Sequence, residues 1–180
     1  MPLSDQLLGA LGRILRDVSR TAARPRRRTP RQRSADRERR APALSDRYPG
    51  DYRGLPRATY DPHPGSLPDP GEVVWTWVPY EEDHRRGKDR PVVLVGRDGD
   101  WLLGLPLTSE DHDPDAAQEA LEGRYWMDIG RGPWDTQGRA SEVRLNRVVR
   151  VDPREVRRVT GRLPKATFDA VVAGMRRHSR

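Results

Sequence analysis

The sequence contains no cysteine, so disulfide bonds and thiolate metal sites are both excluded. It also lacks any apolar run approaching the roughly 18 to 20 residues that a membrane-spanning helix needs. Its first apolar stretch, within residues 4–20, is interrupted by Asp5, Arg13 and Arg16, and this pattern does not predict a secretory signal. The absence of cysteine agrees with a reducing compartment, and we expect a cytoplasmic protein.

Charged residues are distributed unevenly along the 180 residues. The formal net charge of +7 comes from the two ends of the chain, because residues 1–47 carry a net +8 and residues 136–180 another +8, whereas residues 71–135 carry a net −8. A basic end attracts polyanions such as RNA or DNA without sequence preference. A tail that only increases solubility is the alternative.

The chain divides into three predicted parts. Residues 1–20 contain a basic amphipathic helix over residues 4–20, which is suited to a membrane surface, to a partner or to an apolar patch of the protein itself. Residues 21–70 are Arg-rich and then Pro-rich, and they are predicted to form a disordered linker because they have too little apolar surface to bury. Some of the tyrosines between residues 44 and 70 are expected to contact the folded domain, which spans residues 71–180.

This folded domain is predicted to be mainly β with a helix at its end. Strand patterns cover residues 72–78, 91–97, 101–107, 124–129 and 143–151. Asp98-Gly99 predicts a tight hairpin turn, and Pro106 predicts an edge or a bulge. A short helix is expected from Asp113-Pro114 to Gly123, and an amphipathic helix from about residue 164 to 177. Five short strands with a closing helix indicate a small, partly open β-barrel.

Two side chains are expected to meet at one end of a hairpin. Arg90 precedes Pro91, which holds it extended, and Thr108 ends the next strand. Antiparallel pairing brings both residues to the same end. An arginine and a hydroxyl suit a phosphate, because the guanidinium binds two oxygens and the hydroxyl adds a hydrogen bond. The structural alternatives are an ion pair of Arg90 with Asp89 or Glu72, and a capping turn at Thr108.

The order and spacing of these motifs are similar to those of the MazF/PemK family of bacterial toxins. The resemblance covers about residues 71–175 and rests on the following segments: Gly71, Arg90-Pro91, Leu105 to Ser109, Ser141 with Val143 to Arg147, and the helix after Leu163. It implies an SH3-like barrel and a homodimer bound by an antitoxin. It also implies a metal-independent endoribonuclease without a cofactor, which cleaves single-stranded RNA through the 2′-hydroxyl with Arg90 and Thr108 as catalytic residues.

Further side chains near these junctions are candidates for substrate binding: Ser109, Lys88, Arg85, Arg86 and Trp134. Trp134 lies in a glycine-rich loop and is predicted to stack on an unpaired base. His84 and His112 are candidates for general acid and base, or for a metal site with neighbouring aspartates.

The loop Glu81-Glu82-Asp83 departs from the family pattern, because three carboxylates near a phosphate site oppose RNA binding. The alternative function is therefore a non-catalytic module on the same barrel that binds DNA or RNA or docks a peptide.

Overall fold

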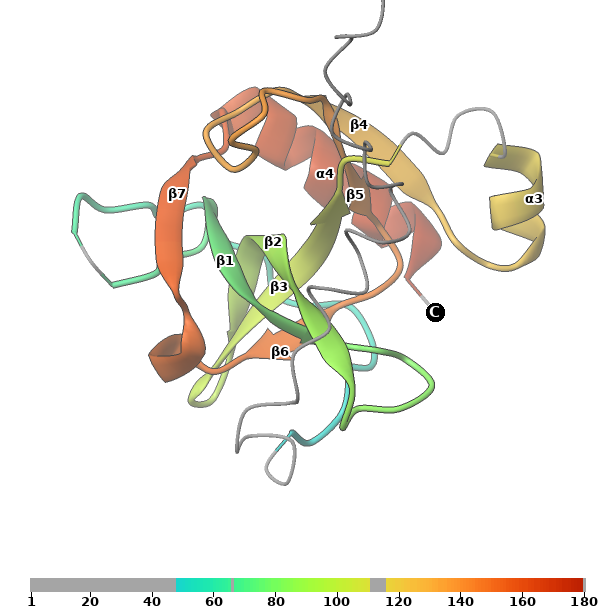
Figure 1. The fold of residues 1–180 in the computed structure, drawn as a ribbon, viewed down its shortest axis with the longest axis horizontal. Helices are drawn as coiled ribbons and strands as arrows, with labels where there is room; N and C mark the ends of the chain where they lie inside the picture. The colour runs from blue at the N-terminus through green and yellow to red at the C-terminus, as the bar shows by residue number, and fades with distance from the viewer. Residues whose placement is uncertain (1–47, 66, 111–115, 180) are drawn as a thin grey trace, which may run out of the picture. The chain divides into compact units, whose positions relative to one another are not determined.

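The computed structural model describes residues 48–65, 67–110 and 116–179. The predicted helix over residues 4–20 and the Arg-rich stretch over residues 21–43 lie outside these ranges. Figure 1 shows strands β1 to β7 curving around one another, with helix α4 lying across one end of the sheet near β4 and β5. The predicted class, a mainly β fold with a C-terminal helix, is confirmed.

Three long antiparallel strands form the centre of the sheet. They are β1 (Glu72–Pro79), β2 (Gly87–Asp98) and β3 (Trp101–Thr108). The register pairs Val74 with Val92 and Val92 with Pro106. Gly99 at the β2–β3 turn has a φ of 58°, which confirms the Asp-Gly hairpin predicted from the sequence.

Four shorter strands complete the sheet, so it has seven strands where five were predicted. They are β4 (Trp126–Gly130), β5 (Ser141–Arg144), β6 (Val149–Val151) and β7 (Arg158–Arg162). The order is β4-β5-β3-β2-β1-β7, and β6 pairs with β3. The single strand predicted over residues 143–151 is wrong, because a turn after Arg144 separates β5 from β6.

Strand β3 lies inside the sheet and not at its edge. Its first half pairs with β6 through Gly104, and its last two residues pair with β5. Pro106 falls between these two pairings. Pro106 has no N–H to donate, and it lies where the partner of β3 on this side changes from β6 to β5.

Two α-helices and one short 3-10 helix lie within the described residues. Helix α3 (Ala116–Leu121) ends before Gly123, whose φ is 71°, and α4 (Lys165–His178) follows Pro164. Both agree with the predicted positions. The 3-10 helix η3 (Pro153–Glu155) connects β6 to β7 and is capped by the side chain of Asp152.

The central strands bury both of their faces, which explains why residues 91–96 of β2 and most of β3 are continuously apolar. One hydrophobic cluster contains Val73, Val93 and Leu105 and also holds the buried face of α4 through Phe168 and Met175. The other cluster lies on the opposite faces of the same strands and consists of these residues: Val74, Val78, Val92, Leu94, Leu102, Val149 and Val151. Alternate residues of one strand therefore belong to two different parts of the core.

Residues 48–65 and 67–70 contact the folded domain, as was expected of the tyrosines, and in this they differ from the disordered linker predicted over residues 21–70. Tyr52 donates its backbone N–H to the carbonyl of Val148 at 2.8 Å. Tyr60 donates its hydroxyl to the carbonyl of Leu163 at 2.8 Å, and its ring packs on Phe168. The tyrosine rings and the backbone hydrogen bonds offset the entropy that was expected to keep this part disordered.

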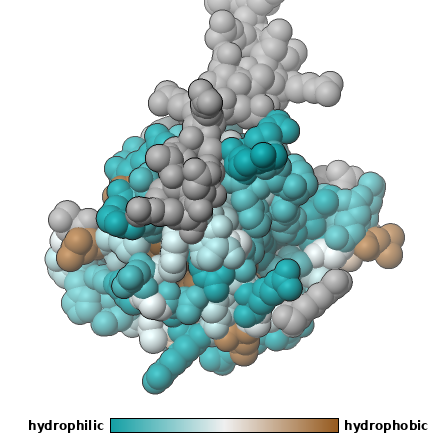
Figure 2. All heavy atoms as spheres, turned by 90° about the horizontal axis from the view of Figure 1, so that it is seen from below, coloured by the Kyte–Doolittle hydropathy of each residue, from teal (hydrophilic) through white to brown (hydrophobic). Residues whose placement is uncertain are grey.

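The surface of the described residues is mostly polar. The face in Figure 2 is hydrophilic over most of its area, and its hydrophobic side chains form separate small patches. Three large apolar side chains are exposed: Leu55, Leu67 and Leu121. Scattered apolar residues of this kind are normal for protein surfaces. Among the described residues no helix is long and apolar enough to cross a membrane.

Candidate phosphate-binding pocket

The strand register places Arg90 and Thr108 side by side. Val92 pairs with Pro106, Val93 with Leu105 and Leu94 with Gly104, and continuing this register by two residues sets Arg90 opposite Thr108. Arg90 also donates a long hydrogen bond of 3.5 Å to the carbonyl of Leu107. The two catalytic candidates from the sequence are therefore neighbours across the β2–β3 ladder.

Both side chains line one pocket with a volume of about 140 Å³. Its walls come from the ends of β1, β3 and β5, from the beginnings of β2 and β4, and from the turn that follows β5. The lining residues are Val78, Pro79, Tyr80, Arg90, Pro106, Thr108, Glu110, Trp126, Arg144 and Arg147. Three of these ten side chains are arginines, so the pocket favours an anion.

Arg90 has no ion pair with the two carboxylates proposed as its structural alternatives. Asp89 pairs with Arg157 at 3.1 Å, and Glu72 accepts a hydrogen bond from the backbone of Asp69. Burial lowers the pKa of Arg90 below its ordinary value, and the nearby Glu110 acts in the opposite direction. An arginine remains protonated at neutral pH even so, and its guanidinium is thus a partly buried cation facing the pocket.

Thr108 is buried, and its hydroxyl oxygen accepts a hydrogen bond from the backbone N–H of Glu110 at 3.1 Å. This is the local turn that was considered as its structural alternative. The bond uses one lone pair of the oxygen and leaves the hydroxyl hydrogen as a donor. The turn and a contact with a bound phosphate are therefore compatible.

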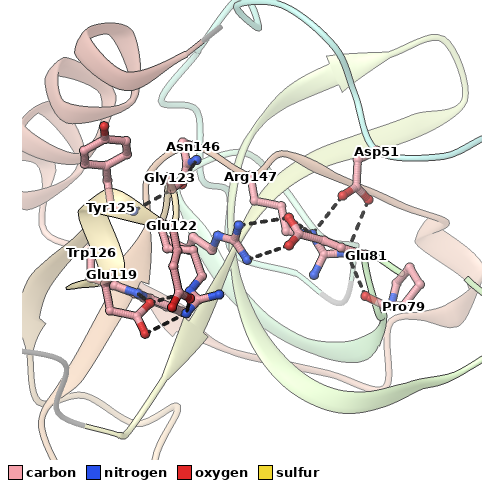
Figure 3. Close-up of polar contacts among 12 residues, drawn as sticks. Asp51, Pro79, Glu81, Glu119, Glu122, Gly123, Tyr125, Trp126, Asn146 and Arg147 are labelled. Atoms are coloured by element: carbon pink, nitrogen blue, oxygen red, sulfur yellow. Dashed lines mark hydrogen bonds and ion pairs between the residues drawn. The ribbon is translucent and has the colours of Figure 1, made fainter. Parts of the chain in front are cut away.

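Arg144 and Arg147 belong to the late motif of the sequence, but sequence reasoning did not identify them as site residues. Arg144 ends β5, and its guanidinium pairs with the Glu81 carboxylate at 2.9 Å. Arg147 lies between Asp51 and Glu81 and donates to the carbonyl of Pro79 at 2.7 Å (Figure 3). Burial lowers the pKa of Arg144, and Glu81 raises it.

Arg144 and Arg147 could not be found from the strand pattern alone. Residues 143–151 were predicted to form one strand, and one strand would point two side chains three positions apart to opposite faces of the sheet. The turn after β5 brings Arg147 back toward the pocket. The usable signal was their place in the motif that resembles the family, together with arginine being the residue suited to bidentate phosphate binding.

The proposal that Trp134 stacks on a base is wrong. Trp134 is 2% exposed, and its indole N–H donates to the hydroxyl of Ser141 at 3.1 Å. The pocket holds Trp126 instead, which is half-buried and donates to Glu119 at 3.0 Å (Figure 3). An aromatic side chain beside the arginines therefore exists, but it comes from β4.

The remaining candidates do not line the pocket. Arg85 is exposed and pairs with Asp83 at 3.2 Å, and the guanidinium of Arg86 lies over the ring of Tyr80. The ring of His84 meets the edge of the Tyr48 ring, 5.1 Å between centroids.

Ser109 and Lys88, both half-buried, are also absent from the pocket lining. His112 lies outside the described residues. Within the described ranges no group of three or more His, Asp or Glu side chains is arranged to hold a metal ion.

Comparison with known proteins agrees with the motifs. Residues 69–178, more than half of the chain, match the family model described as PemK-like, MazF-like toxin of type II toxin-antitoxin system. A search of curated proteins found no match. Among solved structures, the chain is similar to one from the MazE–MazF complex of Deinococcus radiodurans, with 16% sequence identity and a TM-score of 0.42. That match covers 62% of this chain and 94% of the other. From the family match, the chain belongs to the PemK-like, MazF-like toxins of type II toxin–antitoxin systems.

Proposed function

We propose that this chain is an endoribonuclease that cleaves single-stranded RNA through the 2′-hydroxyl of its substrate. The observation that supports the proposal most directly is that Arg90 and Thr108 line one pocket together with Arg144 and Arg147. Four donors of this kind around a small pocket suit a phosphate group of a nucleic acid backbone.

The reaction needs positioning and charge stabilisation more than a protein nucleophile. The substrate 2′-hydroxyl attacks the adjacent phosphorus and its proton passes to Glu110 in the pocket wall. The bond to the 5′-oxygen breaks, and a water molecule gives that oxygen the proton of the 5′-hydroxyl product. Arg90 donates two N–H groups and Thr108 donates its hydroxyl to the phosphoryl oxygens, where negative charge increases in the transition state. The products carry a 2′,3′-cyclic phosphate and a 5′-hydroxyl, and no step uses a metal ion.

Trp126 gives the pocket a surface on which a base next to the scissile phosphate can stack. Its indole is half-buried and lines the same pocket as Arg90. Stacking on an aromatic side chain requires an unpaired base. This requirement is one reason to expect single-stranded RNA and not duplex RNA as the substrate.

The partners follow from the family. Its description includes an antitoxin, and we propose that this toxin is also bound and inhibited by one. We further propose that the toxin acts as a homodimer in the cytoplasm. DNA, as the second polyanion considered from the sequence, lacks the 2′-hydroxyl and is expected to bind without being cleaved.

The test compares cleavage of a mixed-sequence single-stranded RNA by the wild type and by single variants. Arg90→Ala and Thr108→Ala are each expected to lower the cleavage rate about 100- to 1000-fold, the effect of losing one preorganised donor. Arg90→Lys should recover little of it, because an ammonium cannot bind two oxygens in one plane. Mass spectrometry should find 5′-hydroxyl products, and EDTA should leave the rate unchanged.

Arg97→Ala is a matched control for Arg90→Ala. Arg97 lies on the same strand, is half exposed and pairs with Asp69 outside the pocket. Its removal should leave cleavage within about twofold of the wild type, since exposed ion pairs contribute little to stability. Equal cleavage by the wild type, Arg90→Ala and Thr108→Ala would refute the assignment of these two residues as catalytic. No cleavage by the wild type would favour the binding module that was considered as the alternative.

A further inference from the structure

We infer that Arg144 and Arg147 form a second phosphate site beside the Arg90–Thr108 pair, and that the Glu81 carboxylate occupies this site when no RNA is bound. The inference rests on the proposed function, because it assigns the ligand of the second site as a neighbouring phosphate of the same RNA. It makes Glu81 a built-in competitor of the substrate.

Glu81 binds Arg144 as an anionic ligand would. The two terminal nitrogens of Arg144 lie 2.9 and 3.1 Å from the two carboxylate oxygens of Glu81, which is a fork-to-fork arrangement. The Nε of Arg147 lies 3.5 Å from one of the same oxygens. A phosphate group offers a guanidinium the same pair of oxygens in the same plane. The carboxylate therefore fills the position that suits a phosphate.

The arginines are fixed by the fold, whereas the carboxylate is not. The side chains of Arg144 and Arg147 are only 13% and 10% exposed, but that of Glu81 is 46% exposed. Arg147 is held from another side by Asp51, at 2.8 Å, and by the carbonyl of Pro79 (Figure 3). Removing Glu81 thus leaves two positioned cations, whereas removing either arginine disrupts the site.

Arg144 also keeps one donor without an acceptor. Its Nε is buried, and no hydrogen-bond partner for it exists among the described residues. A buried N–H without a partner is costly, and a ligand that supplies an acceptor gains from it. Glu81 engages only the two terminal nitrogens, whereas a phosphodiester whose two non-bridging oxygens bind side-on, to Nε and one terminal nitrogen, also satisfies the Nε of Arg144.

The ligand class follows from the position of this second site. Arg144 and Arg147 line the same pocket as Arg90 and Thr108. RNA carries one phosphate per nucleotide, so a strand that places its scissile phosphate at Arg90 brings the next phosphate close to it. While Glu81 is bound, that phosphate meets a negative charge; once Glu81 leaves, it meets two positive charges. Binding of RNA therefore requires exchange of the carboxylate for a phosphate.

The test uses a fluorescein-labelled 2′-O-methyl RNA oligonucleotide, which has no free 2′-hydroxyl and cannot be cleaved. Its affinity is measured by fluorescence anisotropy for the full chain and two loop variants. Glu81→Gln should tighten binding about tenfold, which corresponds to ~1.4 kcal/mol. Glu82→Gln is the matched control, because Glu82 is the next residue in the loop and is exposed, and the charge change is identical. It should tighten binding by at most about twofold.

A double-mutant cycle connects the effect to the arginine. In an Arg144→Gln background, Glu81→Gln should gain nothing, because the site that Glu81 blocks no longer exists. Arg147→Lys provides a second background with a milder change, and in it Glu81→Gln should still tighten RNA binding by part of the tenfold gain. Circular dichroism and thermal melting of each variant confirm that the compared proteins are folded.

The outcomes separate this inference from the proposed function. Equal tightening by Glu81→Gln and Glu82→Gln would reduce the effect to net charge and overturn the inference, as would no binding by any variant. Loss of cleavage of ordinary RNA by Glu81→Gln at unchanged affinity would make Glu81 an acid–base residue and also overturn it. A wild type that never cleaves, combined with a tenfold gain for Glu81→Gln alone, would refute the endonuclease and leave the second phosphate site standing.

Discussion

Trp126 and Trp134 are the same residue type, eight positions apart, but they have different roles. Trp134 fills the core and hydrogen-bonds Ser141, whereas Trp126 faces the pocket. The sequence pattern places Trp126 in a strand and Trp134 in a glycine-rich loop. Only the pairing of Trp126 with Arg144 across the β4–β5 ladder brings its ring to the site. Sequence alone could not distinguish them, because tertiary pairing decides which ring is covered.

This difference gives a paired prediction. Trp126→Ala should weaken binding of single-stranded RNA by about 1 to 3 kcal/mol, the loss of one stacked base, with little change in stability. Trp134→Ala should lower the free energy of unfolding by about 3 to 5 kcal/mol, because it empties a core position. Anisotropy titrations and urea unfolding measure the two effects. If Trp134→Ala were as stable as the wild type but bound RNA more weakly, the assignment of Trp134 to the core and Trp126 to the RNA site would be contradicted.

Asp135 is a carboxylate whose surroundings predict a pH dependence. Burial raises its pKa, but the hydrogen bonds from the side chain of Arg139, at 2.8 Å, and from the backbone of Gln137 outweigh this effect. The folded-state pKa is therefore below the ordinary value. A lowered pKa stabilises the fold above the pKa of the unfolded chain, about 3.9, and this stabilisation is lost as the pH falls through the folded-state pKa.

We therefore expect Asp135→Asn to destabilise the protein by about 1 to 3 kcal/mol at pH 7. The difference from the wild type should shrink steadily below about pH 4, as the wild-type carboxylate is protonated. Urea unfolding at a series of pH values measures it. A difference that stays constant down to pH 2 would show that Asp135 acts through its shape and not through its charge.

At the scale of the elements, alternating or continuous apolar patterns were sufficient for β1, β2, β3 and α4. The pattern failed where pairing decides the structure. Residues 143–146 and 149–151 each alternate, and the break at Arg147-Val148 lies beside the turn between β5 and β6, where Asn146 accepts a hydrogen bond from the backbone N–H of Tyr125. Strand β7 has few apolar residues, and it exists because it pairs with the open edge of β1. Neither feature leaves a strong local signal.

The pairing of strands also decides which residues of the site could be predicted from the sequence. Arg90 and Thr108 could be predicted to lie at the same end of the hairpin, because one short turn joins their strands. Their exact pairing also depends on a one-residue shift of register between Leu94 and Gly96, which the turn does not fix. Arg144 and Arg147 reach the pocket through the pairing of β5 with β3, which is a contact distant in sequence. That pairing could not be derived from local patterns.

Helix α4 is predicted to depend on its buried face. Phe168 is 3% exposed and belongs to the same hydrophobic cluster as Leu145 and Leu163. Phe168→Ala should lower the free energy of unfolding by about 3 to 5 kcal/mol. Asp169→Ala, at the adjacent exposed position that pairs with Lys165, should change it by less than about 0.5 kcal/mol. If the two variants had similar free energies of unfolding, packing of the Phe168 ring would not be what stabilises helix α4.

At the scale of the whole molecule, the prediction concerns the basic N-terminal part. Residues 1–47 carry a net +8 and hold 13 of the 34 basic residues. Binding of a polyanion releases counterions in proportion to the charges that contact it. Deleting residues 1–47 should therefore flatten the dependence of RNA affinity on salt concentration, as measured by anisotropy between about 50 and 200 mM salt. An unchanged slope would show that these residues do not contact the nucleic acid.

The pairing of β1 with β7 also has a consequence for synthesis on the ribosome. Glu72 pairs with Arg162, and the core is completed by α4, whose last residue is His178. The strand that begins the barrel therefore obtains its second neighbour only after residues 158–162 have been translated. Folds that depend on such distant pairings form slowly, in milliseconds to seconds. A nascent chain that has not yet reached β7 and α4 consequently lacks the second neighbour of β1 and the ring of Phe168 in its core.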